Sequence, residues 1–266
     1  MAGSMEPRED EFVFAADSLI CRVSRENAIL LGGPAAAILQ VAHPVIGAGV
    51  ARHSRFRDDT LGRLHRTLDA VYTVAFGTKV EAKHLRDHVA AVHRPVRGSE
   101  PVGYDAADPE AQMWVLATLI AVATEVFETL VSPLTVEEQE AHYDDMRIFG
   151  EYFGLDRAYG PQGRSEFDRY YAEMLNDERM GSLPESAEVA SAIVKMQRPI
   201  WLAVAGWPTR QLTVETIPSP VRERLGFRST GTGRGAVRAL KASLKGVIPV
   251  LPEAARYCPA ARRRGW

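Results

Sequence analysis

Apolar side chains recur at intervals of three and four residues over most of the first 200 residues, and strict alternation of apolar and polar residues is almost absent. This spacing places apolar residues on one face of an α-helix, whereas a half-buried strand would need a period of two. The sequence therefore predicts an all-α fold that needs no strands. Residues 60–76 show the pattern in its simplest form, with Leu61, Leu64, Leu68, Val71 and Tyr72 on one buried face.

Capping residues indicate where several of these helices begin and end. Asp108 is followed by a proline at the first helical position, and the stretch from Met113 to Leu130 is apolar nearly all round, as expected of a central helix. Thr135 and Glu138 have the spacing of a capping box. Pro95 ends a helix at His93, because the residue before a proline avoids the α region. We expect helices near residues 60–76, with Asp58 or Asp59 as its cap, and near residues 79–93, 108–130, 135–153, 164–177, 185–204 and 234–246, with a proline-rich passage over 207–220 and a loop over 228–235.

Residues 27–51 are almost uncharged and rich in glycine and alanine. Small residues let helices approach closely, and we expect this segment to form the interior, broken near Gly33-Pro34 and His43-Pro44. The sequence shows neither an internal repeat nor a long linker. It therefore predicts a single-domain helical bundle over residues 21–266, with a flexible N-terminal segment at residues 1–20 and a basic C-terminal tail.

Charge is divided unevenly along the chain. Residues 217–266 hold eleven Arg or Lys against two Glu, a balance of +9, whereas the first 216 residues carry −11. We call residues 217–266 the basic strap. It either lies across the acidic remainder of the molecule or meets a phosphate-rich partner or anionic surface. The net charge of −2 argues against nonspecific nucleic-acid binding.

The location of the protein is predicted from three weaker signals. No apolar stretch is expected to reach the roughly 18 to 20 residues that cross a bilayer, so we expect no membrane span. The first ten residues are polar and acidic, unlike a signal peptide. Cys21 and Cys258 form no disulfide framework or metal motif. These signals favour a cytoplasmic protein.

Several common chemistries find no support in the motifs. No GxSxG elbow of a serine hydrolase occurs, and GTGRG at 231–235 lacks the spacing and the preceding strand of a phosphate-cradling loop. The carboxylate pairs at 58–59, 137–138 and 144–145 lie at helix starts or on polar faces, where solvated caps explain them better than acid–base catalysis.

All seven histidines lie in the first 142 residues, and six of them lie between His43 and His93. His84 and His88 share a helical face, but charged neighbours make this a solvent face rather than a metal site. His93 ends its helix after a small apolar run. There it is either a structural residue or the one axial ligand that a haem iron needs, because the porphyrin supplies four further donors.

Several short motifs, in one order along the chain, resemble the MpaB-type oxygenase family, which includes the catalytic domain of a rubber oxygenase. Each motif is weak by itself, but their shared order makes the match specific. The motifs are LQVAHPVIGAGVARHSRFRDD, RLHRTLDAVYTVAFGT, HVAAVHRPVRG, YDAADPEAQMWVLATL and SPLTVEEQEAHYDD, all within residues 27–175, and the ending LPEAARYCPAARRR.

The resemblance implies an all-α fold related to globins in its helix arrangement, and oxygenase chemistry at haem b. By position, it implies that His93 is the proximal ligand of the haem iron. It places Arg63, Arg66 and Thr67 over the opposite face, where fixed donors stabilise negative charge that develops on an oxygen substrate. Arg66 stands where the rubber oxygenase has lysine.

His43 and His53 also lie in family motifs, where they either bind a haem propionate or tie the core together. Many relatives have a histidine where this chain has Leu116, which makes the implied pocket more apolar. The implied activity is therefore oxidation of a small, largely apolar metabolite by O2 or peroxide, rather than cleavage of a solid polymer. The sequence leaves open whether an electron donor or a homodimer takes part.

Two alternatives from other classes remain. One is a haem-binding sensor or carrier without turnover, for which a missing pocket histidine is no handicap. The other is a cofactor-free helical protein that keeps the fold, or one that uses acid–base groups such as His43.

Overall fold

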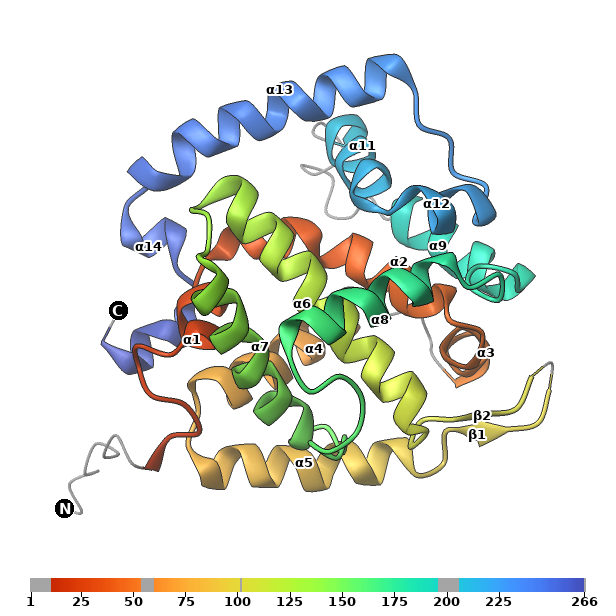
Figure 1. Ribbon diagram of the computed structural model, residues 1–266, viewed down its shortest axis with the longest axis horizontal. Coiled ribbons are helices and arrows are strands. Elements are labelled where there is room, and N and C mark those ends of the chain that lie inside the picture. Colours follow the sequence, from red (N-terminus) through yellow and green to blue (C-terminus); the bar gives the residue numbers. More distant parts are fainter. Residues whose placement is uncertain (1–10, 54–59, 101, 196–205, 266) are drawn as a thin grey trace.

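The computed structural model describes residues 11–53, 60–100, 102–195 and 206–265, without the side chains of residues 60–65 and 263. Within these ranges the molecule is built of helices and one pair of two-residue strands, so the all-α prediction is confirmed (Figure 1). The globin-related arrangement stays a prediction. The α-helices are α1 (Leu19–Ser24), α2 (Gly33–Ala42), α3 (Pro44–His53), α4 (Thr60–Phe76), α5 (Lys79–His93), α6 (Pro109–Leu130), α7 (Val136–Glu151), α8 (Arg164–Asn176), α9 (Pro184–Lys195), α11 (Gly206–Thr216), α12 (Ser219–Arg224), α13 (Gly231–Val247) and α14 (Glu253–Arg256); the 3-10 helices are η2 (Asn27–Gly32), η3 (Ile248–Val250) and η4 (Pro259–Arg264); the strands are β1 (Arg97–Gly98) and β2 (Tyr104–Asp105).

Helix α6 lies at the centre, as its apolar sequence predicts. The Asp108 side chain accepts a hydrogen bond from the Glu110 N–H at 2.8 Å and caps the helix. Trp114 is completely buried, and its indole N–H donates to the Leu39 carbonyl of α2 at 2.8 Å. Helix α6 packs against α2 and η2 on one side and against α7 on another. Helices α2 and η2, which pack directly against α6, therefore belong to the uncharged segment of residues 27–51 that we expected in the interior.

The composition of helix α6 corrects our expectation that no stretch of the chain is long and apolar enough to span a membrane. Pro109–Leu130 is long and apolar enough to cross a bilayer by length and composition, contrary to our prediction that no stretch is. However, 61% of its most apolar window is buried inside the molecule, and the core helix of a folded domain has the same composition.

The segment of residues 27–51 breaks where glycine and proline predict. Helix η2 ends at Gly32, and the chain bends by 102° between η2–α2 and α3. His43 is the residue between α2 and α3, and Pro44 begins α3. A Cβ atom on Gly32 would lie 2.5 Å from a methyl group of Val122 and 2.9 Å from one of Val126. Only glycine at position 32 permits this approach of η2 to α6.

Helix caps follow the sequence closely. Thr135 and Glu138 form the predicted capping box at the start of α7. Thr78 and Glu81 form a second one at the start of α5, which the sequence analysis did not identify. Asp58 and Asp59 lie outside the described residues. Asp145, interpreted as a solvated cap on its own helix, instead accepts the Ile20 N–H of α1 at 3.0 Å and is partly buried.

One predicted loop is partly wrong, and the proline-rich passage is helical. The expected loop over 228–235 is helical from Gly231 onward, because Thr230 caps α13 by accepting the Gly233 N–H. The proline-rich passage over 207–220 contains α11 and α12, whose prolines lie in the first turn, where no N–H is needed for the helix. Proline there starts a helix rather than interrupting one. The end of the helix expected over 185–204 lies partly outside the described residues, since α9 is described to Lys195.

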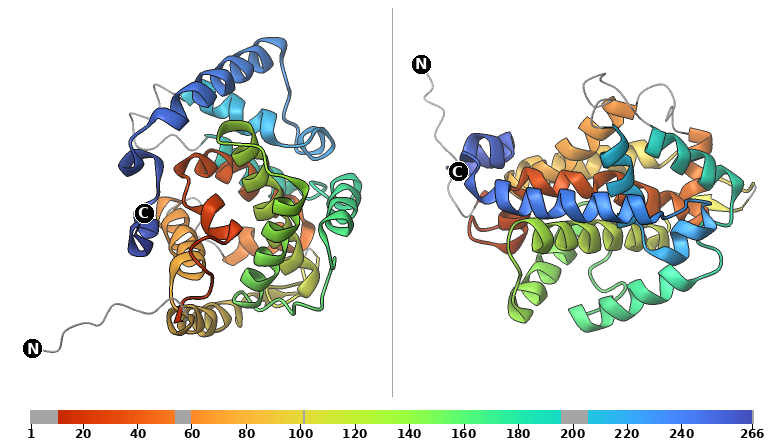
Figure 2. Two further views of the ribbon diagram at one scale, coloured as in Figure 1. Left: turned by 60° about the vertical axis from the view of Figure 1, so that its left-hand side comes forward. Right: turned by 90° about the horizontal axis from the view of Figure 1, so that it is seen from above.

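The basic strap packs along the rest of the molecule (Figure 2). Arg256 forms two hydrogen bonds of 2.8 Å to the carboxylate of Glu26, which is only 1% exposed. Lys241 lies 3.5 Å from Glu125 of α6. These pairs support the interpretation that the strap lies across the acidic remainder of the chain.

The N-terminal segment is part of the fold from Glu11 onward. Phe14 is 5% exposed and belongs to the main core, and the Val13 N–H donates to the Gly77 carbonyl at 3.2 Å. The guanidinium of Arg264 lies 3.7 Å from the centre of the Phe12 ring. The two ends of the described chain therefore meet, and only residues 1–10 of the segment predicted to be flexible lie outside the description.

The close approach at Gly32 yields a stability prediction. Gly32→Ala should lower the free energy of unfolding by about 1–3 kcal/mol, because the new methyl group overlaps two buried valines. Gly33→Ala is the matched control, since its Cβ meets nothing within 4 Å and its backbone is already helical. The control should be neutral or stabilising by about 1 kcal/mol or less. Urea unfolding of both variants measures the difference, and equal stabilities would contradict the tight crossing.

Candidate functional site

The histidines separate into two groups by burial. His53, His84, His88 and His93 are exposed, whereas His43 and His142 are buried. The side chain of His65 lies outside the description. The exposure of His84 and His88 agrees with the solvent face that the sequence predicts.

His93 is the last residue of α5, and its carbonyl accepts the Val96 N–H at 2.8 Å. The preceding turn is apolar yet exposed: Ala90 and Ala91 are exposed, and Val92 is 53% exposed. The residues just before His93 are therefore small and apolar but exposed, like the histidine itself.

Helix α4 packs against α5 after the short turn at Gly77-Thr78. Arg66 and Thr67 lie on α4 and are exposed, like His93 on α5. Arg63 lies one turn earlier on the same helix, and its side chain is outside the description. The structure thus places the predicted donors and the predicted ligand on two adjacent helices.

His53 lies at the C-terminal end of α3 and contacts the segment that follows His93. Its Nε2 atom is 2.9 Å from the Tyr104 hydroxyl, and the two rings meet edge to face with centres 5.6 Å apart. Tyr104 is on β2, which pairs antiparallel with β1 only four residues after His93. A Cβ atom on Gly98 would lie 2.5 Å from the Tyr104 hydroxyl and ring, so glycine makes this packing possible.

Tyr104 is the site residue that sequence reasoning missed. The strands β1 and β2 are two residues long, too short for an alternating pattern to reveal them. The glycine at position 98 and the family motif around YDAADPE were the available signals, and neither identifies a hydrogen bond to His53.

His43 is separated from His53 by the length of α3, a rise of about 15 Å for ten residues. It is 2% exposed, and neither ring nitrogen has a hydrogen-bond partner among the described residues. Its Nε2 atom is 3.8 Å from a carboxylate oxygen of Glu110, which also lies 3.5 Å from Arg179. His43 and His53 are therefore not brought to one point, although the sequence allowed both of them either to bind a haem propionate or to tie the core together.

Burial lowers the pKa of His43, and the nearby Glu110 carboxylate opposes this shift only in part. At neutral pH the ring is therefore neutral. A neutral buried imidazole at the bend between α2 and α3 agrees with the alternative that His43 ties the core together.

Leu116 lies in the core, 4% exposed, on α6. A Cβ atom on Gly150 of α7 would lie 3.0 Å from a methyl group of Leu116, so this side chain faces α7. Thr118, two residues on, is buried and accepts the Gln40 amide N–H at 3.1 Å. The position where many relatives carry histidine therefore lies between α6 and α7, away from the exposed surface around His93.

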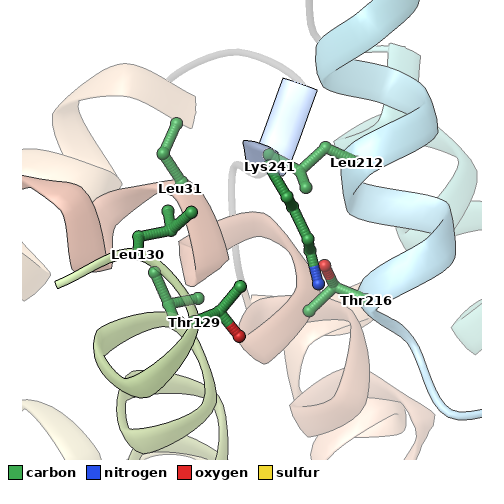
Figure 3. Close-up of a pocket in the computed structure, with 7 residues that line it drawn as sticks. Leu31, Thr129, Leu130, Leu212, Thr216 and Lys241 are labelled. Carbon is green, nitrogen blue, oxygen red and sulfur yellow. The ribbon is translucent and has the colours of Figure 1, made fainter. Parts of the chain in front are cut away.

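A small cavity lies between α6, α11 and α13 (Figure 3). Its volume is about 10 Å³, enough for one water molecule at most, so it cannot hold a metabolite as it stands. Its walls are mostly apolar, with the Lys241 amine reaching across toward Thr216. The lining residues are Leu31, Val126, Thr129, Leu130, Leu212, Thr216 and Lys241.

The residues near His93 fit a haem by the chemistry of their donors. The described residues contain no group of three His, Cys, Asp or Glu side chains that could hold a bare metal ion. A haem iron needs only one protein ligand, and an exposed imidazole is accessible to it. The small exposed side chains of Ala90, Ala91 and Val92 before His93 would leave room for a porphyrin ring.

The comparison with protein families matches residues 21–246 to a family described as ER-bound oxygenase mpaB/B'/Rubber oxygenase, catalytic domain. The chain belongs to this oxygenase family. The match covers the five motifs within residues 27–175 and continues to the last turn of α13, but it stops before the ending at residues 251–264; it confirms the resemblance.

Two curated relatives are uncharacterised mycobacterial proteins. Uncharacterized protein Mb2261 of Mycobacterium bovis and Uncharacterized protein Rv2237 of Mycobacterium tuberculosis are each 33% identical over 151 residues. The match covers 52% of this chain and 57% of each relative, so the chain spans little more than half the length of these proteins. No solved structure matches the chain.

The buried His142 yields a prediction about pH. Burial lowers its pKa to about 4 from an ordinary value near 6.5, and its Nδ1 atom is 3.4 Å from the Thr124 hydroxyl. The unfolded chain therefore binds a proton more readily between pH 6.5 and 4, and stability should fall by up to about 3 kcal/mol as the pH decreases through this range. Above pH 6.5 this contribution is fully present.

His142→Leu should flatten this dependence and cost less stability at pH 4.5 than at pH 7. Urea unfolding at several pH values measures the slope for both proteins. The exposed substitution His84→Leu is the control and should keep the slope of the natural chain. Parallel curves for His142→Leu and the natural chain would assign the acid sensitivity to other groups.

Proposed function

We propose that this protein is a haem b-dependent oxygenase or oxidase that acts on a small, largely apolar metabolite in the cytoplasm. Its membership of the oxygenase family supports the reaction class. The observation that carries the haem assignment is the exposed imidazole of His93, which ends α5 after a short run of small apolar residues and next to α4. Haem, when bound, supplies the activation of O2 or peroxide.

In this proposal His93 holds the iron, and the exposed alanines of the last turn of α5 support the porphyrin. The His53–Tyr104 pair lies beside the segment after His93, where it can hold the edge of the cofactor or one of its carboxylates. His43 has a positioning role at the bend before α3, because it lies at the opposite end of that helix.

Arg63, Arg66 and Thr67 provide two guanidinium groups and a hydroxyl on one helix. Fixed donors of this kind stabilise negative charge on an oxygen-bearing ligand, and they do so most strongly where water is excluded. They would orient the oxidant and the substrate. With O2 as oxidant, insertion of a single oxygen atom also requires an external electron donor that reduces the other atom to water. Insertion of both atoms, two-electron oxidation of the substrate with release of hydrogen peroxide, and reaction with peroxide require no such donor.

A haem carrier or sensor without turnover is the second candidate. The observation that favours it is Leu116, which is packed in the core at a position where the family resemblance leads one to expect an imidazole. Product formation from an apolar substrate, with reductant and O2 or with peroxide, separates the enzyme from the carrier.

His93→Ala should lose most of the bound haem while the helical content stays nearly unchanged, because the side chain is exposed and its removal leaves no core cavity. The absorption spectrum near 400 nm and an iron assay of freshly purified protein measure the loss. His88→Ala, an exposed histidine on the same helix, is the matched control and should keep the haem. Retention of haem with an unaltered spectrum in His93→Ala would move the axial ligand to another residue.

Arg63→Ala should keep the haem but lower kcat by about 10²-fold, the effect typical of removing one donor aimed at developing negative charge. Arg86→Ala on α5 removes an exposed arginine and is the control. Steady-state turnover with the same oxidant measures both variants. An unchanged rate in Arg63→Ala would remove this residue from the distal face.

A further inference from the structure

A groove lies where α12 leads into α13, on the side of the molecule opposite α5 (Figure 1). Its volume is about 430 Å³, within the range of small-molecule sites. Three of its six lining residues are arginines, and the others include one carboxylate and one aromatic ring. The lining residues are Arg222, Glu223, Phe227, Arg228, Ser229 and Arg234.

Two of the three arginines keep their charge free for a ligand. Arg222 pairs with Glu215 at 3.6 Å, but no carboxylate of the described chain lies within 4 Å of Arg228 or Arg234. Glu223 is the acidic residue of the lining, and it is exposed. Across the groove, positive charge therefore exceeds negative charge.

A series of hydrogen bonds and one ion pair connects three of the lining residues to Glu215. Arg234 donates to the Ser229 hydroxyl at 2.9 Å, and Ser229 donates to Glu215 at 2.7 Å. Glu215 also holds Arg222. The guanidinium of Arg234 is thus oriented before any ligand arrives, and less side-chain freedom is lost on binding.

Two further features indicate an anion. The Nε atom of Arg222 is buried and has no hydrogen-bond partner, and a buried donor of this kind ordinarily has an acceptor. The first turn of α13 also contains no acidic residue, and its helix dipole places partial positive charge beside the groove. A Cβ atom on Gly231 or Gly235 would meet nothing within 4 Å, so the backbone there is accessible.

We propose that this groove binds the phosphate group of a ligand, with Arg228 and Arg234 as its main contacts. Guanidinium groups match phosphate oxygens in geometry, and paired arginines favour a doubly charged phosphate over a carboxylate. Phe227 offers a ring edge for the rest of the ligand. The site differs from a nucleotide-binding glycine loop, because the element just before α13 is the helix α12 and not a strand, and it is separate from the proposed haem region.

The test is calorimetric titration of the whole protein with pyrophosphate and ADP at low salt, with sulfate as the comparison anion. Tighter binding of pyrophosphate or ADP than of sulfate is expected. Arg228→Ala and Arg234→Ala should each weaken binding by about tenfold or more, the effect of losing one charged hydrogen bond. Arg169→Ala, an exposed arginine of α8, makes the same charge change elsewhere and should leave affinity unchanged.

Arg234→Lys should recover part of the affinity, because the charge stays while the two-pronged geometry is lost. Thermal unfolding checks that each variant is folded. Arg228 has no hydrogen bond or ion pair to another described residue, so Arg228→Ala is the variant that should disturb the fold least.

A second experiment measures binding of the protein to vesicles with and without phosphatidic acid. Binding only to soluble phosphates indicates a free ligand, and binding only to phosphatidic acid vesicles indicates a lipid headgroup. Sulfate binding as tight as pyrophosphate, or equal binding by Arg228→Ala and Arg169→Ala, would overturn the proposal.

Discussion

The hydrogen bond from Trp114 to the Leu39 carbonyl joins the two helices on which the rest of the structure depends. Helix α2 ends at Ala42, and Pro44 has no N–H, so the last carbonyls of α2 lack partners within the helix. The Trp114 indole N–H donates to the Leu39 carbonyl, and the Gly181 N–H donates to the Ala42 carbonyl at 2.7 Å. The end of α2 is therefore buried without unpaired carbonyls at these two positions, and α6 and the loop before α9 are fixed to it.

The bend after α2 determines where the candidate site forms. Because the chain turns by 102° at His43-Pro44, α3 leaves the core and carries His53 to the β1–β2 hairpin. The same bend keeps His43 in the interior. Two histidines from one sequence motif thus acquire different surroundings, and only His53 remains near the segment that follows His93.

Local features of the fold were predictable from the sequence because they depend on nearby residues. Thr135 with Glu138, and Asp108 with its following proline, each act within one helical turn, and the structure confirms these helix starts. It also confirms the helix end at His93, although Arg94, the residue before Pro95, keeps α-helical backbone angles. Contacts between distant residues were not predictable. The His53–Tyr104 bond depends on a hairpin of two-residue strands. The start of α13 depends on Thr230 acting as a cap inside a glycine-rich string.

The excess positive charge of the basic strap has two consequences, and the sequence alone does not show which cations contribute to each. Some of its cations are used in folding: Arg256 neutralises the buried Glu26, which would otherwise be an isolated charge in the core and costly to keep. Lys241 and Arg222 pair with carboxylates of other helices. Arg228 and Arg234 lie on the same strap but pair with no carboxylate of the described chain. Folding therefore accounts for only part of the strap's charge, and two of the cations that it leaves unneutralised, Arg228 and Arg234, line the same groove.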